Sequence, residues 1–142
     1  MKGISETELI GEALKGREKA YTPYSHFQVG AALLTKEGMV YRGCNIENAA
    51  YTPSNCAERT AFFKAVSEGE RNFEAIAIVG GPEGKLPDAY CAPCGVCRQV
   101  MMEFCDYDSF RILLGRYCDE EIEYIEYRLM DLLPEGFGPD NL

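Results

Sequence analysis

The sequence predicts an α/β fold: a three-layer α/β/α sandwich in which helices cover both faces of a mixed sheet of about five strands. Segments with strand patterning alternate along the chain with segments of helical periodicity, and residues 75–79 (AIAIV) are apolar throughout. A continuous apolar run is typical of a strand that is covered on both faces. A hairpin near the start of the chain argues against a purely parallel sheet, because hairpins pair strands antiparallel.

The chain is expected to begin with a helix that runs to about residue 20. Ser5-Glu6-Thr7-Glu8 matches the capping box, in which a Ser and a Glu side chain satisfy free backbone groups at a helix start. The turn signal Thr22-Pro23 ends the helix. One face of the helix is marked by residues at helical spacing, which are Leu9, Ala13, Leu14, Arg17 and Ala20.

A β-hairpin is expected next. Apolar residues alternate from Phe27 to Leu33, which predicts a strand over residues 27–35. Glu37-Gly38 is a turn signal, and residues 39–44 return as the second strand of the hairpin. The mainly polar segment 45–55 that follows is expected to be a loop.

Two further helices and three further strands complete the predicted fold. Residues 56–68 are rich in helix formers and end at Gly69, and helical stripes of apolar residues resume from Cys94. The segment 80–93 contains three prolines and is expected to be a loop. The remaining strands are expected at residues 75–79, 110–114 and 122–127, with a tail or short helix after them.

Length and charge bound the class of protein. A chain of 142 residues is of ordinary domain size, so residues 1–142 are expected to form a single domain. The net charge of −9 and the lack of a basic run argue against a nucleic-acid partner, because phosphate binding depends on clustered Lys and Arg. A small neutral or cationic ligand fits this charge better.

The sequence favours a cytoplasmic protein with no membrane partner. No apolar run reaches the roughly 18 residues that a membrane span needs, and the first six residues contain no apolar leader. The seven cysteines are odd in number. They suit metal ligands and buried thiols in a reducing compartment better than a disulfide framework.

Two cysteine motifs form a candidate metal site. Cys56-Ala57-Glu58 supplies one thiol and a carboxylic acid, and Cys94-Gly95-Val96-Cys97 supplies two more thiols. Three thiolates can hold one zinc ion and leave its fourth tetrahedral position open for water, whose protons the nearby Glu58 can move. Because structural zinc sites usually have four protein ligands, this set favours catalysis.

The helix starts beside the motifs add to the chemistry. Asn55 is expected to cap the second helix, and Pro93 is expected in the first turn of the third, so all three thiols lie near positive helix ends. These ends lower thiol pKa values. Three thiolates on Zn²⁺ leave a net charge of −1, which we expect Arg59 and Arg98 to offset, and Gln99 is expected to donate a hydrogen bond to a sulfur.

Other interpretations of these residues remain open from the sequence. Cys91 could join the three thiols in a closed structural zinc site, and the run from Cys91 to Cys97 also begins like an iron–sulfur motif. The segment Asn55–Glu58 resembles a capping box, in which the glutamate only closes a helix start.

The remaining cysteines and the histidine are expected to lie outside the metal site. Cys44, Cys105 and Cys118 are expected to pack within strands or helices, which is the usual role of a free cysteine. His26 is the only histidine, and it is expected at the surface or in a turn because three thiols already satisfy the metal.

Five motifs in order give the chain a family resemblance along almost its whole length. It resembles the cytidine deaminases of the small homotetrameric class, whose zinc site and mechanism follow a known deaminase pattern. The zinc ligands here are all cysteines, the variant without a metal-bound histidine. The segments that carry the resemblance are Tyr24–Ala32, Gly43–Tyr51, Cys56–Arg59, Pro93–Gln99 and Leu132–Phe137.

The resemblance implies hydrolytic deamination of cytidine and 2′-deoxycytidine in pyrimidine salvage. One zinc ion per subunit, held by Cys56, Cys94 and Cys97, would bind a hydroxide that attacks C4 of cytosine. Glu58 would take the proton of the water, deliver it to ring N3 and later protonate the departing amine, which leaves as ammonia. Arg59 would neutralise the thiolate cluster.

The resemblance also implies a set of substrate contacts and an assembly. The backbone N–H of Ala57 would hold the pyrimidine carbonyl, Phe27 would pack against the base, and Asn45 and Glu47 would bind the ribose 3′-hydroxyl. Phe137 would close over the base bound in a neighbouring subunit. The active sites of a homotetramer would therefore be shared between subunits.

The sequence leaves alternative functions open. Taken alone, Asn45–Asn48 is a polar turn between a strand and a helix. An aminonucleoside-antibiotic deaminase of the blasticidin type shares the zinc motifs, but Asn45, Glu47 and the C-terminal motif favour cytidine. A structural zinc domain without catalysis is the alternative from another class. Glu47 would repel a 5′-phosphate, which favours a free nucleoside over a nucleotide or polynucleotide.

Overall fold

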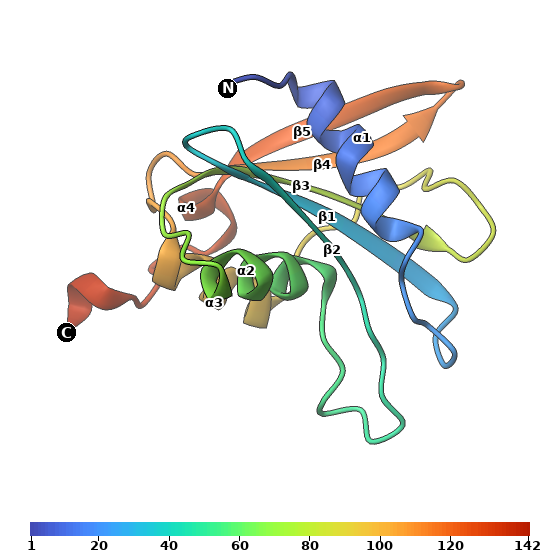
Figure 1. The fold of residues 1–142 in the computed structure, drawn as a ribbon, viewed down its shortest axis with the longest axis horizontal. Coiled ribbons are helices and arrows are strands. Elements are labelled where there is room, and N and C mark those ends of the chain that lie inside the picture. Colours follow the sequence, from blue (N-terminus) through green and yellow to red (C-terminus); the bar gives the residue numbers. More distant parts are fainter.

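The computed structural model describes residues 1–142 and contains one five-stranded sheet with helices on both sides (Figure 1). No helix in it is long and apolar enough to cross a membrane. The elements, in chain order, are α1 (Glu6–Arg17), β1 (Phe27–Thr35), β2 (Val40–Cys44), α2 (Ala57–Ser67), β3 (Phe73–Pro82), α3 (Gly95–Phe104), β4 (Arg111–Cys118), β5 (Glu121–Arg128), α4 (Leu129–Leu132) and the 3₁₀ turn η1 (Pro139–Asn141).

The sheet is mixed, as the sequence predicts. Its strand order is β2-β1-β3-β4-β5. β1 pairs antiparallel with both β2 and β3, and β4 pairs antiparallel with β5. Only β3 and β4 run parallel, and α3 lies in the crossover between them. The α/β/α architecture is therefore confirmed, with a single parallel pair near its centre.

Alternate residues of the central strands supply two separate cores. On β1, Ala31 and Leu33 join the core beneath α2 and α3, whereas Ala32 and Leu34 join the core beneath α1. β3 divides in the same way, and so all of its residues from 75 to 79 are buried. The continuous apolar run in the sequence is explained by this burial on both faces.

Three elements differ in length from their predictions. α1 ends at Arg17 rather than near residue 20, because residues 18–20 turn with i→i−3 hydrogen bonds. β3 extends to Pro82, since Phe27 at the start of β1 pairs with it. β4 extends to Cys118 and turns directly into β5 through Asp119-Glu120, whose positive φ angles suit a two-residue hairpin.

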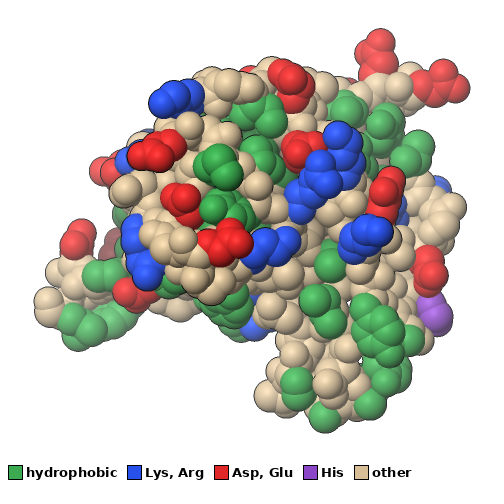
Figure 2. All heavy atoms as spheres, viewed as in Figure 1, with side chains coloured by type: hydrophobic (Ala, Val, Ile, Leu, Met, Phe, Trp, Pro, Cys, Tyr) green, Lys and Arg blue, Asp and Glu red, His purple; other side chains and the backbone are tan.

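Charged side chains of both signs are interspersed over the face that carries α1 (Figure 2). Glu12 of α1 pairs there with Lys15 at 3.1 Å and with Arg42 of β2 at 2.9 Å. At the far end of α1, Arg111 of β4 pairs with Glu6 and Glu126. Ion pairs thus connect α1 to the sheet at its start and at its middle.

A close approach between α2 and β2 positions the N-terminus of α2. A Cβ atom on Gly43 would lie 2.2 Å from the Ala57 carbonyl oxygen and 2.6 Å from the Ala61 nitrogen. Real Cβ atoms do not approach backbone this closely, so only glycine allows α2 to lie where it does. Small side chains on α2 complete the contact, because Ala57 and Ala61 are both fully buried.

We predict that Gly43→Ala lowers the free energy of unfolding by about 3 kcal/mol, because α2 must move away from the sheet. Gly11→Ala is the matched control. Gly11 lies in α1 with nothing within 4 Å of an added Cβ, so this change should stabilise the protein by about 1 kcal/mol. Urea denaturation followed by circular dichroism measures both. Equal stabilities for the two variants would contradict the proposed contact.

Candidate metal centre and active site

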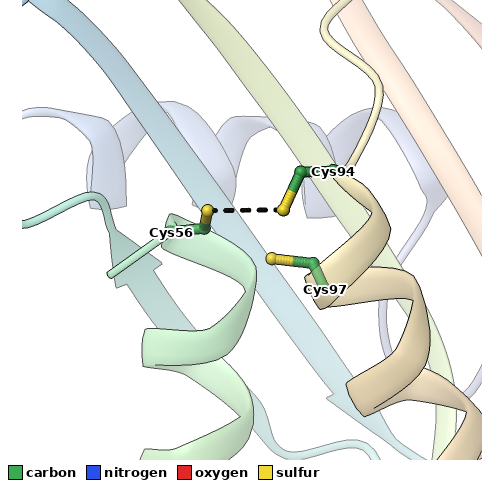
Figure 3. Close-up of side chains that lie close together, drawn as sticks. All are labelled: Cys56, Cys94 and Cys97. Carbon is green, nitrogen blue, oxygen red and sulfur yellow. Dashed lines mark hydrogen bonds between the residues drawn. The ribbon is translucent and has the colours of Figure 1, made fainter. Parts of the chain in front are cut away.

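Three cysteine sulfurs meet where α2 and α3 begin (Figure 3). The Sγ atoms of Cys56, Cys94 and Cys97 all lie within 4.8 Å of one another, and those of Cys56 and Cys94 are 3.7 Å apart. A tetrahedral zinc ion with Zn–S bonds of about 2.3 Å holds its sulfurs about 3.8 Å apart. The donor set and its spacing therefore fit one zinc ion. Cys94 is exposed, so the group is open to solvent on one side.

The two helices begin at cysteines. Cys56 is the N-cap of α2 and Cys94 is the N-cap of α3, and neither side chain makes a capping hydrogen bond. Their sulfurs are thus left free beside the positive ends of two helices, which favours thiolates. The expected caps differ in detail: Asn55 donates to the Thr60 hydroxyl instead of capping α2, and Pro93 lies one residue before the α3 cap.

Glu58 is a buried carboxyl beside the sulfurs. It is the second residue of α2, and only 4% of its surface is exposed. Burial, with a smaller contribution from the nearby Cys56 thiolate, raises the pKa of Glu58 to about 7. A carboxyl that titrates near neutral pH can both accept and donate a proton. The capping-box alternative is wrong, because the N-cap of α2 is Cys56 and not Asn55, and no side chain caps this helix.

The guanidinium of Arg59 contacts the sulfur cluster. Its Nη2 donates to the Sγ of Cys56 at 3.2 Å. A hydrogen bond from the Cys97 thiol and the contact with Arg59 both lower the pKa of Cys56. The same pairing with Cys56 raises the pKa of Cys97. The cluster therefore holds a stabilised thiolate, the form of cysteine that binds a metal.

Arg98 and Gln99 donate hydrogen bonds to the C-terminal segment and not to the sulfurs. Arg98 donates from Nε to the Pro93 carbonyl at 2.8 Å and from Nη1 to the Leu132 carbonyl at 2.6 Å. Gln99 donates to the Phe137 carbonyl at 2.8 Å, so the expected bond to a sulfur is not formed. Successive residues of a helix point about 100° apart, so neither side chain follows Cys97 toward the cluster.

Cys91 lies near the site but outside the group of three sulfurs. Burial raises the pKa of Cys91 to about 11, with smaller contributions from Glu58 and Cys56. The position of its sulfur outside the group favours three ligands over the closed four-thiolate site.

The ring of Phe27, at the start of β1, lies close to Cys91. A Cβ atom on Gly80 would lie 3.2 Å from the Phe27 ring and 2.8 Å from the Cys91 sulfur. Phe27 and Cys91 therefore lie together over the bare backbone of Gly80, and Phe27 remains 40% exposed. Glycine is needed at residue 80 for this packing. A partly exposed aromatic ring is thus left beside Cys91.

Asn45 fastens the start of β1. Its Oδ1 accepts from the Val29 N–H at 2.9 Å, and its Nδ2 donates to the Phe27 carbonyl at 2.9 Å. Asn45 directly follows β2, and its side-chain oxygen binds the Val29 N–H of β1 where a backbone carbonyl would otherwise do so. The amide thus holds the backbone of β1 on both sides of Gln28. One amide hydrogen and one oxygen lone pair of Asn45 remain for a ligand.

Glu47 fastens the turn before β1. Its carboxylate accepts from the Tyr24 and Ser25 N–H groups, at 3.0 and 3.1 Å, and from the Ser25 hydroxyl. The bond from Ser25 lowers the pKa of Glu47, so the side chain is charged. Glu47 also borders a cavity of about 330 Å³, whose other lining residues are Tyr24, Ser25, Tyr51 and Ser54. A cavity of about 550 Å³ between α1, β2 and α2 contains none of the predicted site residues.

Of the two remaining predicted substrate contacts, Ala57 is buried and Phe137 is exposed. Ala57 is fully buried as the first residue of α2, where backbone N–H groups have no partner within the helix. Phe137 is 57% exposed beside α3, where Gln99 holds its carbonyl. The structure thus does not bring the Phe137 ring onto the sulfur cluster of its own chain.

The other cysteines and His26 lie outside the metal group. Cys44 is buried, and Cys105 and Cys118 are half-buried at the ends of α3 and β4. His26 is exposed in a turn with a φ of 54° and pairs with Glu83 at 3.0 Å. None of these residues contributes a ligand atom to the three-sulfur group.

Two residues of the site were not identified from the sequence. The Ser25 hydroxyl accepts from the Phe27 N–H at 3.1 Å and donates to Glu47, so one hydroxyl connects the start of β1 with the loop that contains Glu47. Gly80 forms the floor beneath Phe27 and Cys91. Ser25 lies two residues before Phe27, where a turn-forming hydroxyl could have been anticipated. No local signal marks Gly80.

A family model for the cytidine and deoxycytidylate deaminase zinc-binding region matches residues 4–111. This span contains every cysteine of the metal group and Glu58. The match therefore covers the two helix starts and the strand that carries Phe27.

Several relatives match nearly the whole chain. A cytidine deaminase of Sporosarcina psychrophila is 50% identical over 95% of this chain and 93% of the relative. A crystal structure of cytidine deaminase from Burkholderia pseudomallei is 44% identical with a TM-score of 0.82, covering 94% of this chain and all of that one. The corresponding values for the Mycobacterium tuberculosis enzyme are 34% identity, a TM-score of 0.75, and coverage of 95% and 98%.

We predict that Cys94→Ser reduces bound zinc to less than about half an equivalent per chain, because one of three ligands is lost. Cys91→Ser is the matched control and should retain the full zinc content, since Cys91 lies outside the group. Metal analysis after dialysis against a weak chelator gives both values. Equal losses in the two variants would instead support a closed site with four thiolates.

Proposed function

Because the chain belongs to the zinc-dependent cytidine and deoxycytidylate deaminase family, we propose that it hydrolyses cytidine and 2′-deoxycytidine to uridine and 2′-deoxyuridine, releasing ammonia. One observation carries the proposal: a buried carboxyl that titrates near pH 7 lies beside three sulfurs that are open to solvent on one side. A structural site has no use for such an acid, and a hydrolytic reaction requires one.

Cys56, Cys94 and Cys97 would hold one zinc ion in each subunit. A zinc ion held there would lower the pKa of a water molecule, so that hydroxide would be available at neutral pH to attack C4 of cytosine. Arg59 would offset the excess negative charge of three thiolates through its contact with Cys56. Cys91 would remain a protonated neighbour of this group.

Glu58 would move the protons of the reaction. Its carboxylate accepts a proton from the attacking water, and its acid form donates that proton to ring N3. The carboxylate would then take the second proton of the attacking water, from the oxygen now bound to C4, and donate it to the amine, which leaves as ammonia as the C4 carbonyl forms. The burial that raises its pKa to about 7 makes both forms accessible at neutral pH.

The nucleoside would bind across the start of β1 and α2. The exposed face of Phe27 packs against the pyrimidine, and the free N–H of Ala57 donates to its carbonyl oxygen. Asn45 and Glu47 keep unused hydrogen-bonding capacity after fastening the backbone, which suits the ribose 3′-hydroxyl. The cavity beside Glu47 leaves space next to the sugar.

The charge of Glu47 favours a free nucleoside over a nucleotide. A 5′-phosphate near this carboxylate would be repelled, and the cavity beside it is lined by no basic residue. A nucleoside substrate implies a role in pyrimidine salvage, which takes place in the cytoplasm. The overall charge of −9 agrees with a substrate that carries no phosphate.

We propose that the enzyme is a homotetramer with shared active sites. Phe137 is exposed on a segment that Gln99 and Arg98 hold against α3. Held in this way, its ring can cover a nucleoside bound to a neighbouring copy, whereas it does not reach the sulfurs of its own chain.

A substrate panel tests the proposed reaction. We expect ammonia release from cytidine and deoxycytidine by the zinc-loaded enzyme, with much slower release from CMP, cytosine and blasticidin S. Glu58→Gln should retain zinc and fold while turnover of cytidine falls by about two to four orders of magnitude, because the proton shuttle is lost.

Other outcomes of this panel have distinct meanings. Preferred turnover of blasticidin S would indicate the aminonucleoside-antibiotic deaminase. No turnover by a zinc-loaded tetramer would support a structural zinc domain. Unchanged turnover in Glu58→Gln would contradict the role of Glu58, and a loss of folding would return it to a structural one.

We predict that Phe137→Ala raises the KM for cytidine about tenfold while zinc content stays the same, because the base loses an aromatic cover. Tyr124→Ala is the control, since Tyr124 is an exposed aromatic residue of β5, at the edge of the sheet farthest from β2. Steady-state kinetics and metal analysis check both. Unaltered kinetics in Phe137→Ala would remove this residue from the site.

A further inference from the structure

Arg17 is a buried cation with no acidic partner. It is the last residue of α1, and only 8% of it is exposed. Its Nε donates to the Gln28 carbonyl at 2.9 Å. Its Nη2 lies within hydrogen-bond distance of three further carbonyl oxygens, those of Gly81 at 3.0 Å, Pro82 at 2.8 Å and Lys85 at 2.8 Å. A buried guanidinium is costly unless such bonds satisfy it.

All four carbonyls lie around the backbone that carries Phe27. Gln28 directly follows Phe27, and Pro82 is the residue paired with Phe27 across β1 and β3. Lys85 lies at the start of the segment that leads from β3 to Cys94. One side chain thus joins the start of β1, the end of β3 and the loop beyond it.

The position of Arg17 is itself set by close packing of α1 on β1. A Cβ atom on Gly30 would lie 2.0 Å from the Ala13 carbonyl oxygen and 2.5 Å from the Arg17 nitrogen. The backbone of α1 therefore rests directly on the strand. The guanidinium is thereby placed among the carbonyls at the start of β1, at the end of β3 and in the loop after β3.

Arg17 and Asn45 hold the Phe27 segment through different groups. Asn45 binds the Phe27 carbonyl and the Val29 N–H, and Arg17 binds the Gln28 carbonyl between them. With both in place, the backbone on which the Phe27 ring depends has little freedom. Without Arg17, one of these restraints and the connection to β3 are lost.

We propose that Arg17 is a positioning residue for the base-binding side of the active site and acts through Phe27. The inference rests on the proposed deaminase function. Arg17 makes no hydrogen bond to α2 or α3, which carry Glu58 and the three cysteines. Its loss should therefore weaken nucleoside binding more than it slows the chemical step.

The first measurement is a comparison of Arg17→Met with the unaltered enzyme. We expect the KM for cytidine to rise about tenfold, with kcat within about twofold and zinc content unchanged, since a misplaced aromatic ring weakens binding uniformly. Arg71→Met is the matched control. Arg71 also donates to two backbone carbonyls, those of Val66 and Glu70, but lies at the other end of α2, and its loss should leave KM unchanged.

A double-mutant cycle with Phe27→Ala separates positioning from general stability. If Arg17 acts through Phe27, adding Arg17→Met to Phe27→Ala should change KM by less than about twofold. A tenfold increase that persists without the Phe27 ring would overturn the proposal, as would an equal fall in kcat and rise in KM. If Arg17→Met does not fold, Arg17→Lys takes its place, since it keeps the charge but cannot reach all four carbonyls.

The two proposals fail in different ways. If the unaltered enzyme and Arg71→Met both turn over cytidine while Arg17→Met and Arg17→Lys show an unchanged KM, only the role of Arg17 is wrong. If the zinc-loaded unaltered enzyme does not turn over cytidine, the proposed function fails, and the role of Arg17 fails with it.

Discussion

The close packing of α2 against β2 is the constraint on which the rest of the site depends. Gly43 lets the backbone of α2 come within contact distance of the strand, so the first turn of the helix is buried against the sheet. Ala57 and Glu58 belong to that turn, and Cys56 caps it. Glu58 is 4% exposed in the same turn, and this burial raises its pKa.

Charge is balanced locally within an acidic protein. The net charge is −9, yet the buried guanidinium of Arg17 is satisfied by carbonyl oxygens and not by a carboxylate. Arg59 instead faces a thiolate, so its charge offsets a metal ligand. The buried Arg17 is satisfied by neutral carbonyl dipoles, which fix the backbone, whereas the half-buried Arg59 contacts an opposite charge, which favours the metal-binding form of Cys56.

The residues expected to bind ribose also hold the strand that presents the base-binding ring. Asn45 bonds to the backbone beside Phe27, and Glu47 bonds to the turn that precedes it. Sugar and base recognition are therefore connected through a few backbone groups. A substitution at Asn45 would remove a sugar contact and loosen the base contact, so these effects cannot be assigned separately from a single variant.

Local patterns in the sequence determined the mixed α/β sandwich, the starts of α2 and α3, and the meeting of Cys56, Cys94 and Cys97. These features depend on periodicity and on motif spacing, which are local along the chain. The tertiary structure alone decided the partners of long side chains. It turned Gln99 and Arg98 toward the C-terminal segment, left Cys91 outside the metal group, and placed Arg17 among the carbonyls of three segments. Such partners lie far apart in sequence, as Arg17 and Lys85 do, and their contact depends on how α1 is seated on the sheet. The sequence thus specified which groups the site contains, and the packing of helices on strands specified where each group points.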